Sequence, residues 1–255
     1  MTPDWTPLDT ELARWREAGL TLPFWWRDDD AVAPGPALDR LVALASRFGV
    51  PVHLAVIPAG ATPALADTVA ATPALIPLVH GWAHANHAPE GEKKAEFGVH
   101  RPLTMRRDEA AQSMQTLSRL FGAALAPVFV PPWNRIAPDF APTLKTLGYS
   151  TLSAFGPRKS PEAAPGLVIA NTHLDPIDWH GSRSLAEPAR LIAQIARDLT
   201  DRREGRADNA EPYGLLTHHL VHDAAIWSFT EDLLGRLIAG PATIWTAPRV
   251  QETAA

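Results

Sequence analysis

Short apolar runs alternate along this chain with longer segments whose apolar residues recur at helical spacing. The runs with the length and composition of buried strands are Thr21–Arg27, Val52–Ile57, Leu75–Val79, Pro127–Val130, Ser150–Ala154, Leu167–Asn171, Tyr213–Thr217 and Thr243–Trp245. The segments with helical spacing are Ala37–Phe48, Thr104–Phe121, Pro138–Leu147, Leu185–Arg203 and Ala224–Ala239. This alternation predicts parallel βαβ units, because consecutive parallel strands need a crossover between them.

The length of the chain and the number of these units indicate the architecture. At 255 residues, we expect one α/β domain spanning residues 1–255 that forms an irregular, TIM-like (β/α) barrel of about seven to eight parallel strands. A doubly wound open sheet is the alternative. The chain shows no internal repeat and no linker long enough to divide it.

Composition and charge exclude several classes of protein. The chain has 23 Lys and Arg against 28 Asp and Glu, a formal charge of −5, whereas a nucleic-acid-binding domain normally carries a basic face. With no Cys, it has neither a thiolate nucleophile nor a Cys-ligated zinc site. It has no apolar stretch of about 18 residues and no basic start followed by an apolar run. We therefore expect a cytoplasmic protein without a membrane span or a secretory signal.

Polar and aromatic side chains gather where the predicted strands end. They lie in the segments Arg27–Asp30, His80–His87, Pro131–Asn134, His173–His180 and His218–His222. The carboxyl ends of the strands in a (β/α) barrel form one mouth, where the catalytic residues of such folds lie. We therefore expect these segments to contribute to one site.

Two histidines and a cluster of aspartates indicate a metal site. His80 and His84 are four residues apart, which places both imidazoles on one face of a helical turn. Asp28, Asp29 and Asp30 directly follow a strongly apolar strand, where three like charges are costly unless a cation neutralises them. Imidazole and carboxylate groups suit Zn²⁺ or another divalent transition metal, and three of them leave a fourth position for water. Surface histidines and an aspartate-rich turn are the alternative interpretation.

A second histidine cluster and three tryptophans lie in the remaining segments. His218, His219 and His222 follow an apolar strand, and a histidine there can protonate a leaving group near neutral pH. A hydrogen-bonded surface cluster is equally compatible with their spacing. The tryptophans that adjoin the predicted mouth are Trp82, Trp133 and Trp179. Each alone is more typical of a core, whereas the three together favour a platform for sugar rings.

In chain order, these segments resemble the five short motifs of the polysaccharide deacetylases, also called carbohydrate esterase family 4. Trp26–Asp29 resembles the Thr-Phe-Asp-Asp motif, and His80–His84 has the spacing of the His-Ser/Thr-x-x-His motif. Phe129–Trp133 resembles the Arg-x-Pro-Tyr motif, and Asp175–Trp179 resembles the motif with Asp and Trp. Leu216–His218 resembles the Leu-x-His motif. The resemblance covers most of the chain.

The resemblance implies a metal-dependent hydrolase that removes an acetyl group from a carbohydrate or a related amide or ester. It implies that Asp28 is the general base, that His218 is the general acid, and that the metal ligands are Asp29, His80 and His84. For substrate binding it implies residues of the third and fourth motifs, which are Pro132, Trp133, Asp178 and Trp179. The expected partner is an acetylated carbohydrate or another small molecule, and neither nucleic acid nor a membrane is expected.

Several positions depart from the family pattern and leave assignments open. Asp30 replaces the usual glycine, so the first motif also fits one residue later, with Asp29 as base and Asp30 as ligand. Gly81 replaces the hydroxyl residue of the second motif. Leu220–His222 fits the Leu-x-His pattern as well as the preceding segment does.

The third motif shows the departure with the largest consequence. Val130 replaces the arginine that orients the catalytic aspartate in the family, and Arg27 or Arg135 is the candidate to take over that contact. The same replacement supports an alternative function, that of a catalytically inactive barrel that binds carbohydrate. Another alternative keeps the metal but hydrolyses a non-sugar C–N bond in a small metabolite.

Overall fold

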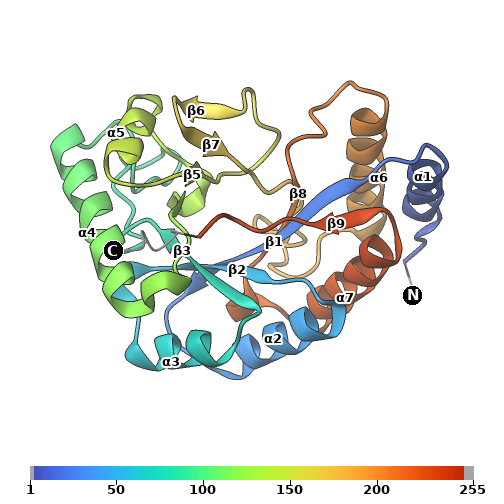
Figure 1. The fold of residues 1–255 in the computed structure, drawn as a ribbon, viewed down its shortest axis with the longest axis horizontal. Coiled ribbons are helices and arrows are strands. Elements are labelled where there is room, and N and C mark those ends of the chain that lie inside the picture. The colour runs from blue at the N-terminus through green and yellow to red at the C-terminus, as the bar shows by residue number, and fades with distance from the viewer. Residues whose placement is uncertain (1–2, 250–255) are drawn as a thin grey trace, which may run out of the picture.

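A curled, mostly parallel sheet forms the centre of the protein, and helices pack around it (Figure 1). The computed structural model describes residues 3–249. The strands are β1 Leu22–Ala31, β2 Val52–Val56, β3 Leu75–His80, β4 Val128–Val130, β5 Thr151–Leu152, β6 Glu162–Ala164, β7 Leu167–Ile169, β8 Tyr213–Thr217 and β9 Ala242–Ile244. The helices are α1 Thr6–Glu17, α2 Pro36–Phe48, α3 Pro63–Ala71, α4 Leu103–Phe121, α5 Ala141–Thr146, α6 Pro188–Arg203 and α7 Ala224–Ala239. Within residues 3–249, no helix is both long enough and apolar enough to cross a bilayer.

The sheet has the topology of an irregular barrel. Its strands follow the order β6-β7-β5-β4-β3-β2-β1-β8, and β9 pairs with β1. All of these pairs are parallel except β6 with β7. Two single bridges, Phe155 with Thr172 and Leu174 with Leu215, continue the pairing from the end of β5 round to β8. The fold is therefore the predicted irregular (β/α) barrel and not the open sheet.

Each predicted strand and helix is present, and most of their ends shift by only a few residues. Helices α1 and α3 and strand β6 were not predicted. The difference that matters for function is in β1, which continues past Arg27 to Ala31. The three aspartates therefore lie within the strand instead of after it.

Both faces of the central strands are buried, as expected for parallel strands with helices on one side and a barrel interior on the other. In β1, Trp26 packs into the cluster that contains the helices, whereas Trp25 packs with Leu78 and Val130 on the inner face. The ring of Trp25 also contacts Trp245, just after β9, edge to face. Side chains thus fill the interior, and the polar ends of the strands remain available to form a site.

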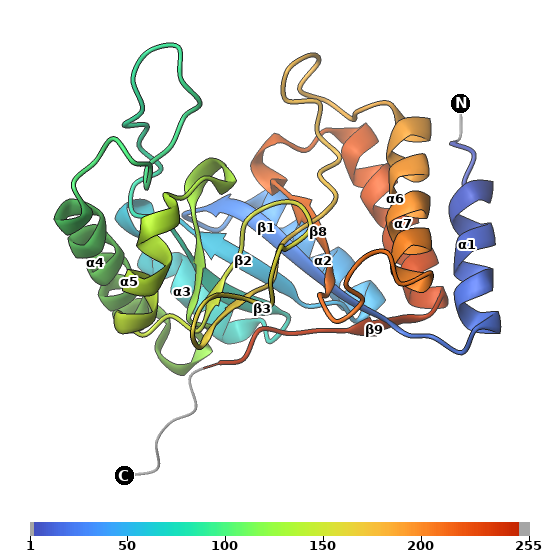
Figure 2. The ribbon, with the colours of Figure 1, turned by 90° about the horizontal axis from the view of Figure 1, so that it is seen from above.

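Two long connections extend from one end of the sheet. One joins β3 to α4 and the other joins β7 to α6, and both project to the same side of the molecule (Figure 2). The carboxyl end of β3 leads directly into the first connection. The mouth of the barrel therefore lies between segments that are distant in the sequence.

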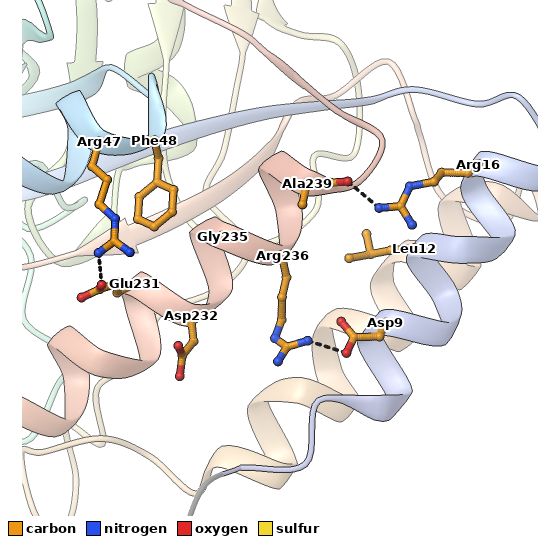
Figure 3. Close-up of a pocket in the computed structure, with 10 residues that line it drawn as sticks. All are labelled: Asp9, Leu12, Arg16, Arg47, Phe48, Glu231, Asp232, Gly235, Arg236 and Ala239. Carbon is orange, nitrogen blue, oxygen red and sulfur yellow. Dashed lines mark hydrogen bonds and ion pairs between the residues drawn. The ribbon is translucent and has the colours of Figure 1, made fainter.

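A groove of about 440 Å³ lies between α1, α2 and α7 (Figure 3). Two ion pairs lie along it, Arg236 with Asp9 and Arg47 with Glu231. The groove is lined by helix residues alone. These pairs join α7 to α1 and to α2, and the groove lies apart from the strand ends.

Candidate active site

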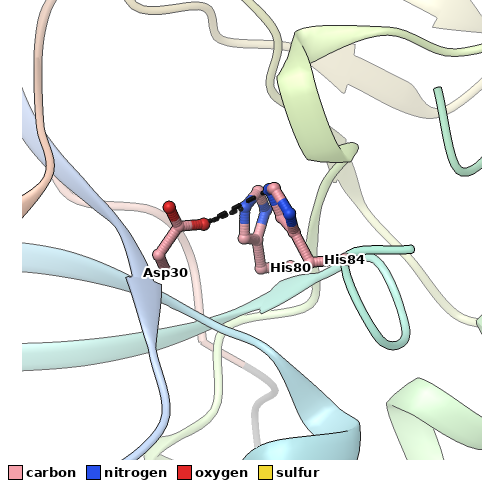
Figure 4. Close-up of side chains that lie close together, drawn as sticks. All are labelled: Asp30, His80 and His84. Atoms are coloured by element: carbon pink, nitrogen blue, oxygen red, sulfur yellow. Dashed lines mark hydrogen bonds and ion pairs between the residues drawn. The ribbon is translucent and has the colours of Figure 1, made fainter. Parts of the chain in front are cut away.

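Three side chains from β1, β3 and the connection after β3 converge at the mouth of the barrel (Figure 4). Asp30 Oδ1 lies 3.2 Å from His80 Nε2 and 3.3 Å from His84 Nε2. One possible ligand atom from each residue lies within 4.8 Å of the others. We call these residues the Asp–His cluster. The structure thus brings the two predicted histidines together, and the carboxylate between them belongs to Asp30 rather than Asp29.

An irregularity in β1 directs Asp30 toward the histidines. Side chains of a regular strand alternate between its faces, which would place Asp30 on the same face as Asp28. Instead, the pairing of β1 with β2 shifts register between Asp28 and Ala31, and Asp30 has a φ of 76°. Aspartate tolerates this left-handed region better than most residues. The shift therefore turns Asp30 into the mouth, a direction that strand alternation alone does not predict.

Hydrogen bonding determines how His80 presents its ring. Its Nδ1 lies 3.0 Å from the carbonyl oxygen of Val130 and donates there, so Nε2 faces Asp30 with a free lone pair whenever the ring is neutral. Such an anchor on the second nitrogen is typical of metal-binding histidines. The donor set of one carboxylate and two imidazoles, with one ring anchored, therefore fits a divalent transition metal.

The charges within the Asp–His cluster favour an ionised carboxylate. For Asp30, burial favours the neutral acid, but the hydrogen bond and the charge of His80 outweigh burial and lower the pKa of the carboxyl. For His80, burial opposes protonation, but the carboxylates of Asp29 and Asp30 raise its pKa. Burial lowers the pKa of His84, and the charge of His80 lowers it further. The cluster therefore contains an anionic oxygen beside an imidazole that favours the neutral form.

Asp29 lies beside the Asp–His cluster and is held by Arg27, two residues earlier on the same face of β1. Arg27 Nε and Nη2 donate to the two carboxylate oxygens at 2.9 and 3.0 Å. Arg27 is fully buried and also donates to Ser153 Oγ at 2.7 Å and to Asn134 Oδ1 at 2.6 Å. Such a two-pronged contact fixes the orientation of a carboxylate. Of the two arginines considered above, Arg27 makes this contact, and Arg135 donates to a main-chain oxygen of the β3–α4 connection.

Asp28 points to the opposite face of β1 and binds β8 and the turn after it. Its buried carboxylate accepts from Thr217 Oγ1 at 2.6 Å and from the main-chain N–H of His219 at 3.0 Å. Its second oxygen lies 2.5 Å from His219 Nδ1. Burial favours the neutral acid, but His219 and Thr217 outweigh it and lower the pKa of Asp28. Asp28, which was expected to be the general base, therefore uses both carboxylate oxygens to bind Thr217 and His219.

The three histidines after β8 have different surroundings. The ring of His218 packs edge-on against Trp179, with centroids 4.8 Å apart, and its charge acts on the carboxyl of Asp30. His218 Nδ1 is buried and has no hydrogen-bond partner among the described residues. His219 pairs with Asp28, and His222 Nε2 accepts from the main-chain N–H of His218. Of the three histidines, His218 is thus the one that contacts Trp179 and whose charge acts on Asp30 of the Asp–His cluster.

The segment after β4 packs against the second histidine of the Asp–His cluster. Pro132 and Trp133 lie in the short 3-10 turn Pro132–Asn134, and the ring centroid of Trp133 lies 4.3 Å from that of His84. Five non-glycine residues in the described chain have a positive φ, namely Asp30, His84, Trp133, Asn134 and Arg183. Such conformations cost roughly 1–3 kcal/mol each and gather at functional sites. The strained backbone at this mouth is consistent with a site that is held in place by its surroundings.

In the segment with Asp and Trp, Asp175 contacts the site and Asp178 stabilises its own loop. Trp179 Nε1 donates to Asp175 Oδ2 at 2.7 Å. Burial raises the pKa of the Asp175 carboxyl. Asp178 accepts from the main-chain N–H groups of Gly181 and Ser182, each at 3.1 Å. The structure therefore places Trp179 at the mouth and gives Asp178 partners within an exposed turn.

One buried residue near the Asp–His cluster was not predicted from the sequence. Glu96 lies in the β3–α4 connection, and its carboxylate accepts from three main-chain N–H groups around His84. The signal in the sequence is Gly81, which stands where the second motif has a hydroxyl side chain. A position without a side chain next to His80 indicates that another group approaches the backbone there.

Comparisons with known proteins support the fold. No protein-family model matches the sequence, and no curated protein is significantly similar to it. A candidate polysaccharide deacetylase from Mycobacterium smegmatis aligns with a TM-score of 0.57 and 16% identity over 83% of this chain and 73% of that chain. The family 4 carbohydrate esterase from Streptomyces lividans, solved with acetate, aligns with a TM-score of 0.56 and 12% identity over 88% of this chain and 92% of that chain. The family 4 acetyl xylan esterase from Clostridium thermocellum, solved with a cobalt ion, aligns with a TM-score of 0.52 and 13% identity over 88% and 87%.

Proposed function

This chain has the fold of the polysaccharide deacetylases, and from this we propose that it is a metal-dependent hydrolase that removes an acetyl group from a carbohydrate or a related amide or ester. A fold alone does not define an activity. The observation that carries the proposal is the Asp–His cluster, with a second, arginine-held aspartate beside it. A metal-ligand set next to a positioned base is one arrangement that can hydrolyse an acyl group.

The proposed ligands of Zn²⁺, or of another divalent transition metal, are Asp30, His80 and His84. This set uses the later register of the first motif and replaces Asp29 by Asp30. Its support is the convergence of the three donor atoms and the anchored ring of His80. When bound, the ion supplies Lewis acidity, which polarises a carbonyl group and lowers the pKa of water.

Asp29 is the proposed general base. Each of its oxygens receives one N–H from Arg27, and a carboxylate oxygen has two lone pairs. Each oxygen therefore keeps a lone pair with which to accept the proton of the attacking water. Arg27 holds the carboxylate in one orientation while this proton moves, and Asp28 supports β8 instead of acting on the substrate.

His218 is the proposed general acid, which donates a proton to the leaving amine or alcohol. Its neighbour Trp179 limits the orientation of the ring. Trp133 and Trp179 contact the two sides of this constellation through His84 and His218. We propose that these indole rings, with Pro132, pack against the sugar that carries the acetyl group.

We expect His218→Ala to lower turnover of substrates with poor leaving groups much more than turnover of activated phenyl acetates. The physical reason is that a phenolate leaves without a proton, whereas an amine or an alkoxide needs one, and a general acid contributes about 10²–10⁴-fold. The two turnover rates are measured as acetate release from an acetylated sugar and from a nitrophenyl acetate. Equal losses on the two substrates would show that His218 acts in some other way.

A substrate panel tests the proposed function. Acetate release is measured from N- and O-acetylated sugars, and ring opening is measured from a set of cyclic amides, before and after the metal is removed by chelation. We expect metal-dependent acetate release from the sugars. Metal-dependent opening of the cyclic amides alone would favour the small-metabolite alternative, and sugar binding without turnover would favour the inactive barrel.

A further inference from the structure

Glu96 is a fully buried carboxylate in the connection between β3 and α4. Its Oε2 accepts from the main-chain N–H of Trp82 at 3.0 Å. Its Oε1 accepts from Ala83 at 2.8 Å and from Ala85 at 3.2 Å. These N–H groups flank His84 in the chain. One side chain therefore fixes the backbone on both sides of the second histidine of the Asp–His cluster.

The negative charge of Glu96 is compensated by backbone dipoles and not by a cationic side chain. A buried carboxylate is costly unless it receives several strong hydrogen bonds. Among the described residues, no ion pair involves the Glu96 side chain, and Arg101 donates to its main-chain oxygen while pairing with Glu109. Among the described residues, the hydrogen bonds of this side chain all go to the turn that carries His84.

Gly81 makes room for this carboxylate. It has a φ of 55°, and a Cβ there would lie 2.2 Å from Glu96 Oε2 and 2.6 Å from Pro132 Cδ. Both distances are shorter than any normal contact, so a side chain at position 81 excludes Glu96 from its present place. The absence of a hydroxyl residue from the second motif and the presence of Glu96 are thus parts of one arrangement.

The rest of the connection folds back so that Glu96 reaches the turn. Asn86 Oδ1 accepts from Ala88 at 3.1 Å and from Ala95 at 3.0 Å, and the N–H of His87 donates to the carbonyl of Ala95 at 3.0 Å. These bonds close the projecting loop seen in Figure 2 at its base. Glu96 follows directly after this closure.

We propose that Glu96 is a positioning residue for the metal site, which holds His84 in its ligand geometry through the N–H groups of Trp82, Ala83 and Ala85. This inference rests on the proposed function, since it assumes that His84 binds a metal. Partners of metal ligands commonly change affinity by about 10–100-fold when they are mutated. We expect substitution of Glu96 to lower the metal affinity by an amount within that range.

The test compares Glu96→Gln with the matched control Glu90→Gln, which removes the same charge from an exposed position on the same loop. The amide of Gln places an N–H₂ group against at least one of the three N–H donors. We expect the affinity for Zn²⁺, measured by competition with a chelator, to fall about tenfold or more in Glu96→Gln and to stay unchanged in Glu90→Gln. The visible spectrum of the Co²⁺-substituted protein should change in the Glu96 variant alone.

The outcomes separate the inference from the proposed function. Wild-type protein that binds no divalent metal overturns both. Wild-type protein that binds metal, with the same affinity and the same Co²⁺ spectrum in folded Glu96→Gln, overturns the inference and leaves the proposed function intact. If Glu96→Gln does not fold, Glu96→Asp replaces it, because it keeps the charge but is one methylene too short to reach all three donors. The same loss of affinity is then expected, and unchanged affinity again overturns the inference.

Discussion

Asp30→Asn is expected to abolish stoichiometric metal binding, whereas Asp29→Asn is expected to keep the metal and to lose turnover by about 10²-fold or more. The Asp30 carboxylate is the one that faces both imidazoles of the Asp–His cluster. A neutral amide is a poorer donor to a divalent cation and removes the charge attraction. Asn at position 29 leaves the three proposed ligands in place but removes the proposed proton acceptor. Metal content and acetate release of the purified variants measure the two effects.

Two further variants make this prediction specific. Asp67→Asn changes the same chemical group at an exposed position on α3 and is expected to leave metal content and acetate release unchanged. Asp28→Asn is expected to keep its metal, since Asp28 binds Thr217 and His219 on the other face of β1. Metal loss in Asp29→Asn together with full metal in Asp30→Asn would restore the earlier register of the first motif.

Arg27→Met is expected to destabilise the protein by about 3–5 kcal/mol and to abolish most of the turnover of the folded fraction. Removing one partner of a buried ion pair leaves the other charge buried without compensation, and this is the usual magnitude. Arg27 and Asp29 are both buried and joined by two hydrogen bonds. Without the arginine, the Asp29 carboxylate also loses the two N–H donors that fix its orientation, so it can no longer act as a positioned base. Urea unfolding and acetate release, each at several pH values, measure these consequences.

A double variant distinguishes the loss of the pair from the loss of packing. In Arg27→Met/Asp29→Asn no charge is left unpaired, so we expect it to be more stable than Arg27→Met alone, although it lacks two native side chains. It is expected to remain inactive. If the double variant is less stable than the wild type by the sum of the effects of Arg27→Met and Asp29→Asn, the two residues do not act as a pair.

The fold could be predicted from the sequence because its determinants are local. The run Val52–Ile57 is apolar on both faces, and Ala37–Phe48 has apolar residues at helical spacing, and both form the expected elements. Helix α3 was missed although Thr62 caps it with a hydrogen bond to the N–H of Leu65. Such a cap is a clear signal, but the helix that follows is short and weakly amphipathic. Strand β6 pairs at the edge of the sheet, and its three residues carry no pattern.

The site was predictable only in part, because several of its features depend on the conformation of the backbone. The four-residue spacing of His80 and His84 predicted that they lie together, but the expected helical turn was wrong. His80 ends β3, and His84 follows in an irregular turn with a positive φ at Gly81 and at His84. The register of the aspartates depends on the irregularity before Ala31, which no side-chain pattern encodes. Glu96 acts through N–H groups 11 to 14 residues earlier in the chain, which depend on how a long loop folds back. Arg27 was one of the two candidates to replace the missing arginine, and its contact is with Asp29, because residues two apart on a strand share a face.

The most direct test of the central claim is to remove the metal and restore it while acetate release is followed. The purified protein is assayed on an acetylated sugar as isolated, after exhaustive chelation, and after addition of one equivalent of Zn²⁺ or Co²⁺. With Asp30, His80 and His84 as ligands, we predict one bound divalent ion per chain, loss of acetate release on chelation, and its recovery on addition of the ion. Acetate release that continues at the same rate in protein shown to be free of metal would contradict the account.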